Sequence, residues 1–551
     1  MMCKNLLVIF VTICLIVTGS EGNRLNDYIK HYEPLSYDSD ALMDEHTRLT
    51  RSASGPSHLQ LHFSALGRSF KLRLYQGSPS LTSDAVVMVD DKPVTHYKSL
   101  LYHGVDEDDS SVRVHGNMAM GVFSGQIHTS DETYFIEPSS RYVRGTEAHS
   151  VIYRSSDVVM PEGGGTCGHS NEDIYKHLAK KSTITKSQKR VTRQSNSTNT
   201  RCELKVIADD QYYNMITSEL GNDPSLKQAV VISFMTAYVD AVREIYERTN
   251  FGGQLGITFA IANLIVETEP SPPFDRPNLG VEAFLDFHSQ ADYSDFCLSY
   301  RFTARDFDGG VLGLAYIGKL PNSGSVGGIC ENVRPGPQTL NTGIVTIVNY
   351  EREVPQLVVQ LTFAHEIGHN FGSEHDMTTS CSPGDENGGN YIMFSHASTG
   401  SQPNNDDFSQ CSRDMMTRLI TGKGQDAVNG CFTANEGAIC GNEIVEDGEE
   451  CDCGRDASGE FNNDTCCDCP SCTLPVSIVC SPSQGPCCSS SCLLLTNSTV
   501  CQAETECQEE SVCKYPCFVC VCVYLCMHPP TSVPLRHGLQ CISPASSSSD
   551  S

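Results

Sequence analysis

The residues best suited to chemistry lie in HEIGHNFGSEH, which runs from His365 to His375. Because side chains four apart share one face of a helix, His365 and His369 can present two imidazoles to one metal ion. Gly372 can adopt the positive φ that ends a helix and turns the chain, so that His375 returns as a third ligand. Three imidazoles with one open coordination position are typical of catalytic zinc, whereas structural zinc is enclosed by four protein ligands.

Glu366 has a different task from its neighbours, because it points about a hundred degrees round the helix from His365. We expect it to accept a proton from the water that attacks a peptide carbonyl and to deliver it to the leaving amine. The motif therefore predicts a zinc metalloendopeptidase. The alternative, three merely solvated or core histidines, requires the whole pattern to coincide by chance. His103 and His169 lack this spacing, and we expect both to be ordinary surface residues.

Met393 follows in NYIMFS, eighteen residues after His375. The extended metzincin signature includes a Met-turn beneath the zinc site. A methionine in an apolar run is also commonly a core residue, and here the two interpretations coincide. Both predict that Met393 packs under the ligands without binding metal.

Cys167 is the single cysteine between Asn23 and Arg193 and sits in EGGGTCGHS, where glycines allow a close backbone approach to a cleft. A thiolate is a good zinc ligand, so Cys167 could fill the open coordination position in a latent form. The alternative is an inert buried thiol. Latency would end when the chain is cut in KRVTR, where Arg190 and Arg193 suit a secretory processing protease. A merely solvated basic loop is the other interpretation of that stretch.

The elements that must position these residues are visible in the hydrophobic pattern. Short alternating runs between Leu59 and Ile136 predict antiparallel strands. From Cys202 onward, strand-like runs alternate with a helical pattern near 226–249 and another that starts near Pro355 and carries His365. Such alternation predicts an α/β domain. The polar stretch from Lys176 to Arg201 suits an exposed linker.

Composition sets the compartment and excludes some partners. The 551 residues carry a net charge of −29, which disfavours nucleic acid. Lys4 precedes the apolar run Leu6–Val17 and small residues, which predicts a cleaved secretory signal, with a buried strand as the alternative. Export favours disulfides, and nineteen of the 28 cysteines lie at 440–541, which predicts a loop-rich, disulfide-held region. No apolar run is long enough to span a bilayer.

The chain from about Asn23 to Cys513 resembles the ADAM proteases, the reprolysin branch of the metzincins, and in particular their Kuzbanian type. The resemblance rests on RDFDGGVLGLAYIG, LNTGIVTIVNY, TFAHEIGHNFGSEHD and NGGNYIMFS. It implies an α/β metzincin domain, with a mixed sheet and an active-site helix, after a β-rich prodomain and before a disulfide-rich, loop-dominated disintegrin-like domain. The expected boundaries are a signal peptide at 1–22, a prodomain at 23–193, a metalloprotease domain at 194–435, a disintegrin-like domain at 436–513 and a divergent tail at 514–551.

The resemblance also implies site residues beyond the zinc motif. An extended substrate would add as a strand along the edge formed by Leu312, Gly313, Leu314 and Ala315. The six cysteines of the protease region allow fifteen pairings. Family similarity suggests Cys202 with Cys297, Cys330 with Cys431, and Cys381 with Cys411.

The region after Cys440 contributes a second candidate metal site. Four oxygen-bearing side chains recur among cysteines in CGNEIVEDGEECDCG, and the resemblance assigns a structural Ca²⁺ to them: Asn442, Glu446, Glu449 and Asp452. A solvated acidic loop is the alternative. Asn196, Asn463 and Asn497 lie in glycosylation sequons. After Cys513 the resemblance fails, and the odd number of cysteines in the tail suggests a truncated isoform or a mispredicted exon.

The function that these features predict is shedding of membrane-protein ectodomains, of Notch type and amyloid-precursor type by resemblance. We expect the product in the secretory pathway and outside the cell or at its surface. One alternative is a non-catalytic adhesion or decoy protein that acts through the disintegrin-like region, although the intact Glu366 argues against it. Another is a secreted degradative metzincin of matrix or venom type.

Overall fold

The computed structural model describes residues 28–182 and 199–434, together with parts of 450–521. The first two ranges are interrupted by gaps at 52–57, 77–79, 95–99, 110–111, 140–141, 143–147, 161–163, 171, 219, 255, 322, 332–337, 399 and 427–429. We call 28–182 the N-terminal segment and 199–434 the central segment. Arg190, Arg193, the signal region at 1–22 and the tail beyond 521 lie outside the described residues.

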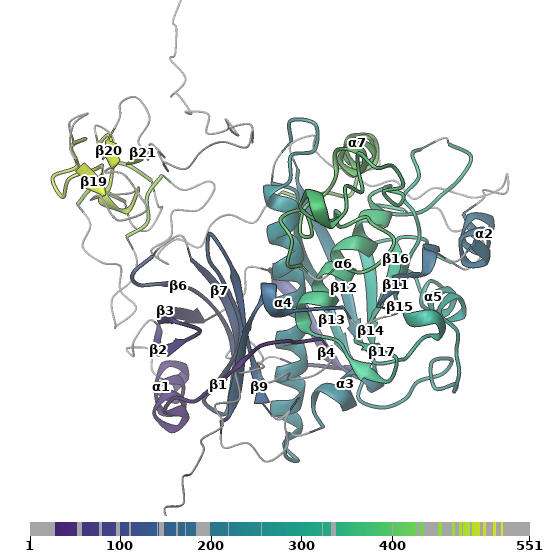
Figure 1. Ribbon diagram of the computed structural model, residues 1–551, viewed down its shortest axis with the longest axis horizontal. Coiled ribbons are helices and arrows are strands. Elements are labelled where there is room, and N and C mark those ends of the chain that lie inside the picture. Colours follow the sequence, from purple (N-terminus) through teal and green to yellow (C-terminus); the bar gives the residue numbers. More distant parts are fainter. Residues whose placement is uncertain are drawn as a thin grey trace, which may run out of the picture.

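The N-terminal segment forms an eight-stranded sheet in the order β1-β10-β9-β8-β7-β6-β3-β2, in which every pair is antiparallel (Figure 1). Its strands are β1 Glu33–Leu35, β2 Leu59–Ala65, β3 Arg68–Gln76, β6 Leu101–Asp106, β7 Arg113–Ala119, β8 Val122–His128, β9 Thr133–Pro138 and β10 Ser150–Arg154. Alternate residues of β2 and β3 are buried, as the period-2 pattern predicts, and helix α1 (Ser39–Arg51) contacts β2 and β8.

The central segment is built on a second eight-stranded sheet of mixed direction, in the order β11-β15-β16-β14-β12-β13-β4-β5. Five of its strands come from the central segment: β12 Arg201–Ala208, β13 Thr258–Val266, β14 Leu298–Thr303, β15 Val311–Ala315 and β16 Thr342–Thr346. The three pairings that join β13, β12, β14 and β16 are parallel, and β15 is antiparallel to β16. Short strands β17 (Val348–Asn349) and β18 (Arg352–Glu353) form a separate hairpin.

The N-terminal segment supplies strands at both edges of this second sheet. Strand β4 (Leu81–Val89) pairs parallel with β13 and continues into β5 (Lys92–Pro93), whereas β11 (Thr166–Cys167) pairs parallel with β15. The prediction that all strands from Leu59 to Ile136 are antiparallel neighbours is therefore wrong for β4. Because β4 pairs with β13, a strand about 180 residues away in sequence, no local pattern reveals its partner.

Helix α4 (Pro224–Arg248) lies between the two sheets in Figure 1 and contacts both β7 and β13. Asp223 caps its start by accepting hydrogen bonds from the backbone of Ser225 and Leu226, and Pro224 occupies the first turn. An unbroken run from Ala229 to Val242 is buried, because the helix has partners on opposite sides. This burial makes α4 the common core element of the two segments.

The remaining helices are α2 Glu172–Lys181, α3 Asp210–Ile216, α5 Val281–His288, α6 Gln356–Asn370 and α7 Gln410–Leu419. The described part of 450–521 has little regular secondary structure. Its strands are β19 Val500–Gln502, β20 Ser511–Cys513 and β21 Cys520–Val521. Its disulfides are Cys451–Cys467, Cys466–Cys492 and Cys480–Cys488. Among the described residues, no helix combines the length and apolar character needed to cross a bilayer.

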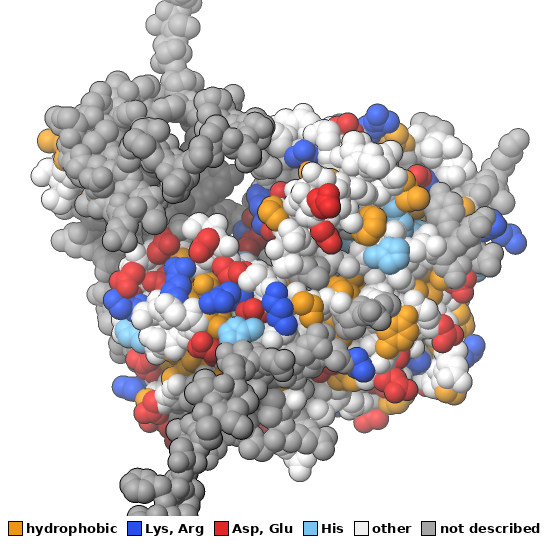
Figure 2. Space-filling model, in the orientation of Figure 1, with side chains coloured by type: hydrophobic (Ala, Val, Ile, Leu, Met, Phe, Trp, Pro, Cys, Tyr) orange, Lys and Arg blue, Asp and Glu red, His pale blue; other side chains and the backbone are white. Residues whose placement is uncertain are grey.

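Acidic and basic side chains are interspersed over the described surface seen in Figure 2. No continuous basic field appears on the described part of that face, consistent with the net charge of −29.

Candidate metalloprotease active site

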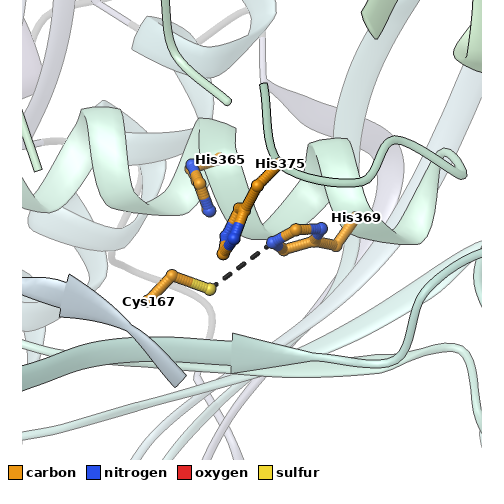
Figure 3. Close-up of side chains that lie close together, drawn as sticks. All are labelled: Cys167, His365, His369 and His375. Atoms are coloured by element: carbon orange, nitrogen blue, oxygen red, sulfur yellow. Dashed lines mark hydrogen bonds between the residues drawn. The ribbon is translucent and has the colours of Figure 1, made fainter. Parts of the chain in front are cut away.

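Helix α6 carries the metal motif and is buried along its whole length. The turn that follows uses Gly372 at φ 94°, and the backbone amide of Ser373 donates to the carbonyl of Gly368. This left-handed turn reverses the chain after α6, which returns His375 to the same place as His365 and His369. The structure thus brings together the three histidines that the spacing selects (Figure 3).

The cluster has four members, because Cys167 lies with the histidines. One ligand atom from each of the four residues is within 4.8 Å of the others. The Sγ of Cys167 lies 3.4 Å from the Nε2 of His369, and Cys167 is a buried free thiol. Figure 3 shows all four side chains pointing into one space between α6 and strand β15.

Hydrogen bonds outside the cluster set the histidine tautomers. The Nδ1 of His365 lies 2.6 Å from the carbonyl oxygen of Ile392, and the Nδ1 of His369 lies 2.8 Å from that of Ser373. Since a carbonyl only accepts, both Nδ1 atoms carry the proton and both Nε2 lone pairs face the cluster. The Nε2 atoms of His365 and His375 are buried, and neither has a hydrogen-bond partner among the described residues.

Electrostatics keep these imidazoles neutral. Burial lowers the pKa of His365 to about 4 and that of His375 to about 2, and it lowers that of His369 well below the ordinary value. Burial, and then the neighbouring Glu366 carboxylate, raise the pKa of the Cys167 thiol. Neutral imidazoles with converging lone pairs plus one sulfur are the donor set that Zn²⁺ prefers, so the residues present fit this metal.

Glu366 lies beside the cluster and against β15. It is fully buried, and burial raises its pKa to about 8, with the nearby Cys167 thiol opposing part of the shift. Gly313 makes room for it, because a Cβ added at Gly313 would lie 2.6 Å from the Cγ and Oε1 atoms of Glu366. The absence of a side chain at this strand position is thus a requirement of the site.

Met393 is fully buried beneath α6. Its Sδ lies 2.3 Å from the place where a Cβ at Gly368 would stand, between the turns that carry His365 and His369. A small pocket of about 30 Å³ opens beside Glu366, and its apolar lining includes Leu361, Ile392 and Phe394.

The N-terminal segment enters the cleft as a strand. Thr166 is in register with Val311 and Cys167 with Gly313, so Cys167 is delivered to the cluster by backbone pairing. The residues expected as the substrate edge, Leu312, Gly313, Leu314 and Ala315, all lie in β15. In the described residues their outer side is covered by β11.

His169 corrects the expectation that it is a surface residue. Its side chain is buried, its Nε2 donates to the carbonyl of Ala315 over 2.7 Å, and its ring centroid lies 4.4 Å from that of His369. His103 is buried as well, in the first sheet. The signal that could have identified His169 is its place two residues after Cys167, which keeps it inside the same cleft.

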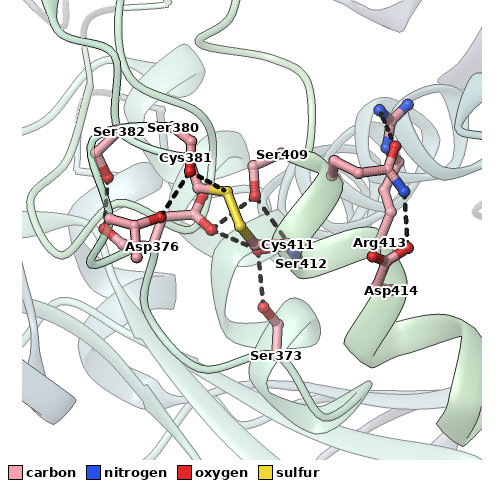
Figure 4. The surroundings of a disulfide bond; sticks show 12 residues. Ser373, Asp376, Ser380, Cys381, Ser382, Ser409, Cys411, Ser412, Arg413 and Asp414 are labelled. Atoms are coloured by element: carbon pink, nitrogen blue, oxygen red, sulfur yellow. Dashed lines mark hydrogen bonds between the residues drawn. A yellow bond between two sulfur atoms is a disulfide. The ribbon is translucent and has the colours of Figure 1, made fainter.

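A disulfide and a polar network hold the loop that carries His375 (Figure 4). The Oδ1 of Asp376 accepts hydrogen bonds from the hydroxyls of Ser409, which caps α7, and Ser412. Cys381–Cys411 joins the same two segments. Cys202–Cys297 and Cys330–Cys431 are also present, so the three pairs are those that the family resemblance implies.

The candidate calcium site is described at one position. Asp452 is buried, and its backbone amide donates to the hydroxyl of Ser483. Asn442, Glu446 and Glu449 lie outside the described residues, as do the sequon residues Asn196, Asn463 and Asn497.

Comparison with known proteins also indicates a metalloprotease. Residues 228–422 match the Metallo-peptidase family M12B, Reprolysin-like. Disintegrin and metalloproteinase domain-containing protein 10 of Bos taurus is 36% identical over 538 residues, which cover 90% of this chain and 69% of the relative. The homologue of that protein in Caenorhabditis elegans is 32% identical over 632 residues, which cover 98% of this chain and 67% of the relative.

Proposed function

We propose, from the premise that this chain belongs to the disintegrin and metalloproteinase (ADAM) family of zinc metalloendopeptidases, that it is made as a latent zymogen and sheds the ectodomains of membrane proteins. Within that class, we propose Notch-type and amyloid-precursor-type substrates, on the resemblance to the Kuzbanian type. The observation that carries the zymogen proposal is Cys167 at 3.4 Å from His369 inside the histidine cluster.

The proposed roles follow from the arrangement of the side chains. His365, His369 and His375 would hold the zinc, which when bound polarises the scissile carbonyl and acidifies water at neutral pH. Glu366, fully buried beside the histidines, takes the proton of the attacking water and returns it to the leaving amine. The backbone of β15 orients the substrate by strand addition.

Latency would use the same cleft. In this proposal residues 23–193 are the prodomain, 194–435 the protease domain and 436–513 the disintegrin-like domain, after a signal peptide at 1–22 and before the tail at 514–551. Cys167 takes the open metal position while β11 covers β15. Cleavage after Arg193 by a secretory processing protease then frees the prodomain. This proposal is supported by the position of the Cys167 thiol, which lies within 4.8 Å of a ring nitrogen of each of the three histidines.

The acidic loop is a proposed structural Ca²⁺ site, formed by Asn442, Glu446, Glu449 and Asp452. A purely adhesive or decoy role has less support, because Glu366 and the three histidines are all present, with Glu366, His365 and His369 buried and His375 half-buried beside them.

The deciding experiment uses the full chain, secreted from cells, treated with a processing protease and given a quenched peptide library beside its Glu366→Ala twin. We expect cleavage by the wild type that a zinc chelator abolishes and added Zn²⁺ restores, and none by the twin. Equal metal content in the two proteins is the control. A folded, zinc-loaded and processed wild type that cleaves no peptide would contradict the proposal.

A further inference from the structure

Asp286, on α5, is shared between the protease domain and the prodomain. Its Oδ1 accepts hydrogen bonds from the protease side chains Tyr316, at 2.9 Å, and Gln338, at 3.4 Å. Its Oδ2 lies 2.9 Å from the Nε2 of His177 and 3.2 Å from the Nζ of Lys181, both on helix α2 of the prodomain. One carboxylate oxygen is therefore held by the protease itself, and the other by two nitrogen groups that belong to the prodomain.

The position of Asp286 connects it to the substrate cleft. Tyr316 follows directly after β15, three residues beyond Gly313, which is in register with Cys167. At about 3.3 Å per residue, the Tyr316 end of the strand is roughly 10 Å along the cleft from the metal cluster. A peptide extended along β15 passes this point about three residues from its scissile bond.

Removal of the prodomain changes the two oxygens differently. Tyr316 and Gln338 stay with the protease, and they keep the carboxylate in its present orientation. His177 and Lys181 leave with α2, which ends at Lys181, shortly before the stretch 183–198 that contains the proposed cleavage point. The Asp286 side chain is 16% exposed even with α2 in place. The departure of α2 would thus leave an oriented carboxylate whose outer oxygen is no longer covered by His177 and Lys181, beside the end of β15.

We propose that Asp286 forms a subsite in the mature protease that selects a lysine or arginine side chain of the substrate, a few residues from the scissile bond, and that His177 and Lys181 occupy this subsite in the latent chain. The proposal rests on the proposed function and names a feature of its substrates. The protein's net charge of −29 acts in the same direction, because it attracts basic peptides.

The test compares processed full-length wild type with Asp286→Asn, which keeps an oxygen for Tyr316 and Gln338 but removes the charge. Peptides of one cleavable sequence carry lysine, arginine, norleucine or glutamate in turn at each of five positions on either side of the scissile bond. At one position we expect kcat/KM to be about three- to tenfold higher for lysine or arginine than for norleucine, mainly through KM. The variant should lose this preference and cleave the norleucine peptide as fast as the wild type. Cleavage without a preference that depends on Asp286 at any position would overturn the proposal.

A binding measurement separates this inference from the proposed function. Fluorescence anisotropy reports binding of the lysine and norleucine peptides to processed Glu366→Ala protein, with and without Asp286→Asn, so no catalysis is needed. We expect tighter binding of the lysine peptide only when Asp286 is present, and equal binding would overturn the subsite even if every protein were inactive. Should Asp286→Asn fail to fold, the wild type still tests the proposal. The lysine preference at the one favoured position should shrink between 50 and 500 mM salt by more than any difference at the other positions, because those positions experience only the net charge of the protein. The Debye length falls from about 10 Å at 0.1 M to about 3 Å at 1 M salt. A preference that salt leaves unchanged would count against the carboxylate.

Discussion

The Sγ of Cys167 lies 3.4 Å from the Nε2 of His369, although 202 residues separate the two in the chain. The contact is not carried by the thiol alone. Cys167 is in register with Gly313 across a strand pair, its backbone amide donates to the carbonyl of Ser395, and His169 donates to the carbonyl of Ala315. The thiol is therefore one of several contacts that close the cleft.

Because several contacts close the cleft, Cys167→Ala should activate the unprocessed chain only in part. Removal of the thiol should raise peptide cleavage above that of the unprocessed wild type. Activity should stay at least about tenfold below that of the processed enzyme, because the remaining backbone and His169 hydrogen bonds are worth about 1 kcal/mol each. Processed Cys167→Ala should match processed wild type. Full activity of the unprocessed variant would mean that the thiol alone enforces latency.

Gly313→Ala tests the close approach of β15 to Glu366, the proposed catalytic carboxylate. The new Cβ would overlap Glu366, at 2.6 Å from its Cγ, and must displace it. We expect kcat to fall about 10- to 100-fold, since a shift of about 1 Å in a catalytic group costs a factor of that order. Metal content and thermal unfolding should change little.

Gly221→Ala is the matched control for Gly313→Ala, because a Cβ there meets no atom within 4 Å. This second variant should keep the wild-type kcat. An unchanged kcat in Gly313→Ala would show that Glu366 can move away from β15 without loss of function.

Part of this site can be predicted from the sequence alone, because it depends on residues that are close together in the chain. The i, i+4 spacing of His365 and His369 and the glycine at 372 specify a helix, two ligands and a turn. The run 226–249 likewise predicts α4, which the structure places at Pro224–Arg248.

Contacts between distant segments have no such local signal. The pairing of β4 with β13 and of Asp286 with His177 depends on how separate stretches meet in space. His169 was predicted at the surface for the same reason: its partner, Ala315, lies 146 residues away.

Asp376→Ala should weaken metal retention without touching a proposed ligand. The Asp376 carboxylate ties the loop after His375 to Ser409 and Ser412, so its removal frees the loop and leaves buried hydroxyls without their acceptor. We expect zinc affinity to fall about 10- to 100-fold, as is typical for residues that orient metal ligands, and the free energy of unfolding to fall by about 1–3 kcal/mol. Competition with a chelator of known affinity measures the first effect, and thermal unfolding of the chelated protein measures the second.

The control is Asp385→Ala, a change at an exposed residue of the same loop, which should alter neither zinc affinity nor stability. Wild-type zinc affinity in Asp376→Ala would assign the loop's position to Cys381–Cys411 alone.

The contact between the sheet of the N-terminal segment and α4 contains a group of titratable side chains. Glu244 on α4 lies 3.0 Å from His115 on β7 and 3.5 Å from His128 on β8, and Asp240 lies 4.0 Å from His115. Burial alone would lower the pKa of His115, but the hydrogen bond to Glu244 and the charge of Asp240 outweigh it and leave the pKa raised. Burial dominates at His128 and lowers its pKa.

The two histidines give the contact opposite pH dependences. Because its pKa is raised in the complex, His115 stabilises the contact fully below its free value of 6.5 and loses this effect as the pH rises through its bound pKa. His128 behaves in reverse: its lowered pKa means that the contact is intact above 6.5 and weakens as the pH falls towards the bound value. We therefore expect the N-terminal segment of a chain cut between residues 183 and 198 to stay bound best near pH 6.5.

Size-exclusion chromatography of the cut full-length protein between pH 5 and 8.5 measures this retention. His128→Gln should remove the loss on the acid side and leave the alkaline side unchanged, whereas His115→Gln should remove the alkaline loss and weaken retention at pH 6.5. The charges of Arg243 and Arg248 on α4 are common to all three proteins, so they cancel in the comparison. Each variant is expected to remove the loss of retention on a different side of pH 6.5. If both variants changed the dependence of retention on pH in the same way, the pH dependence would arise elsewhere in the contact.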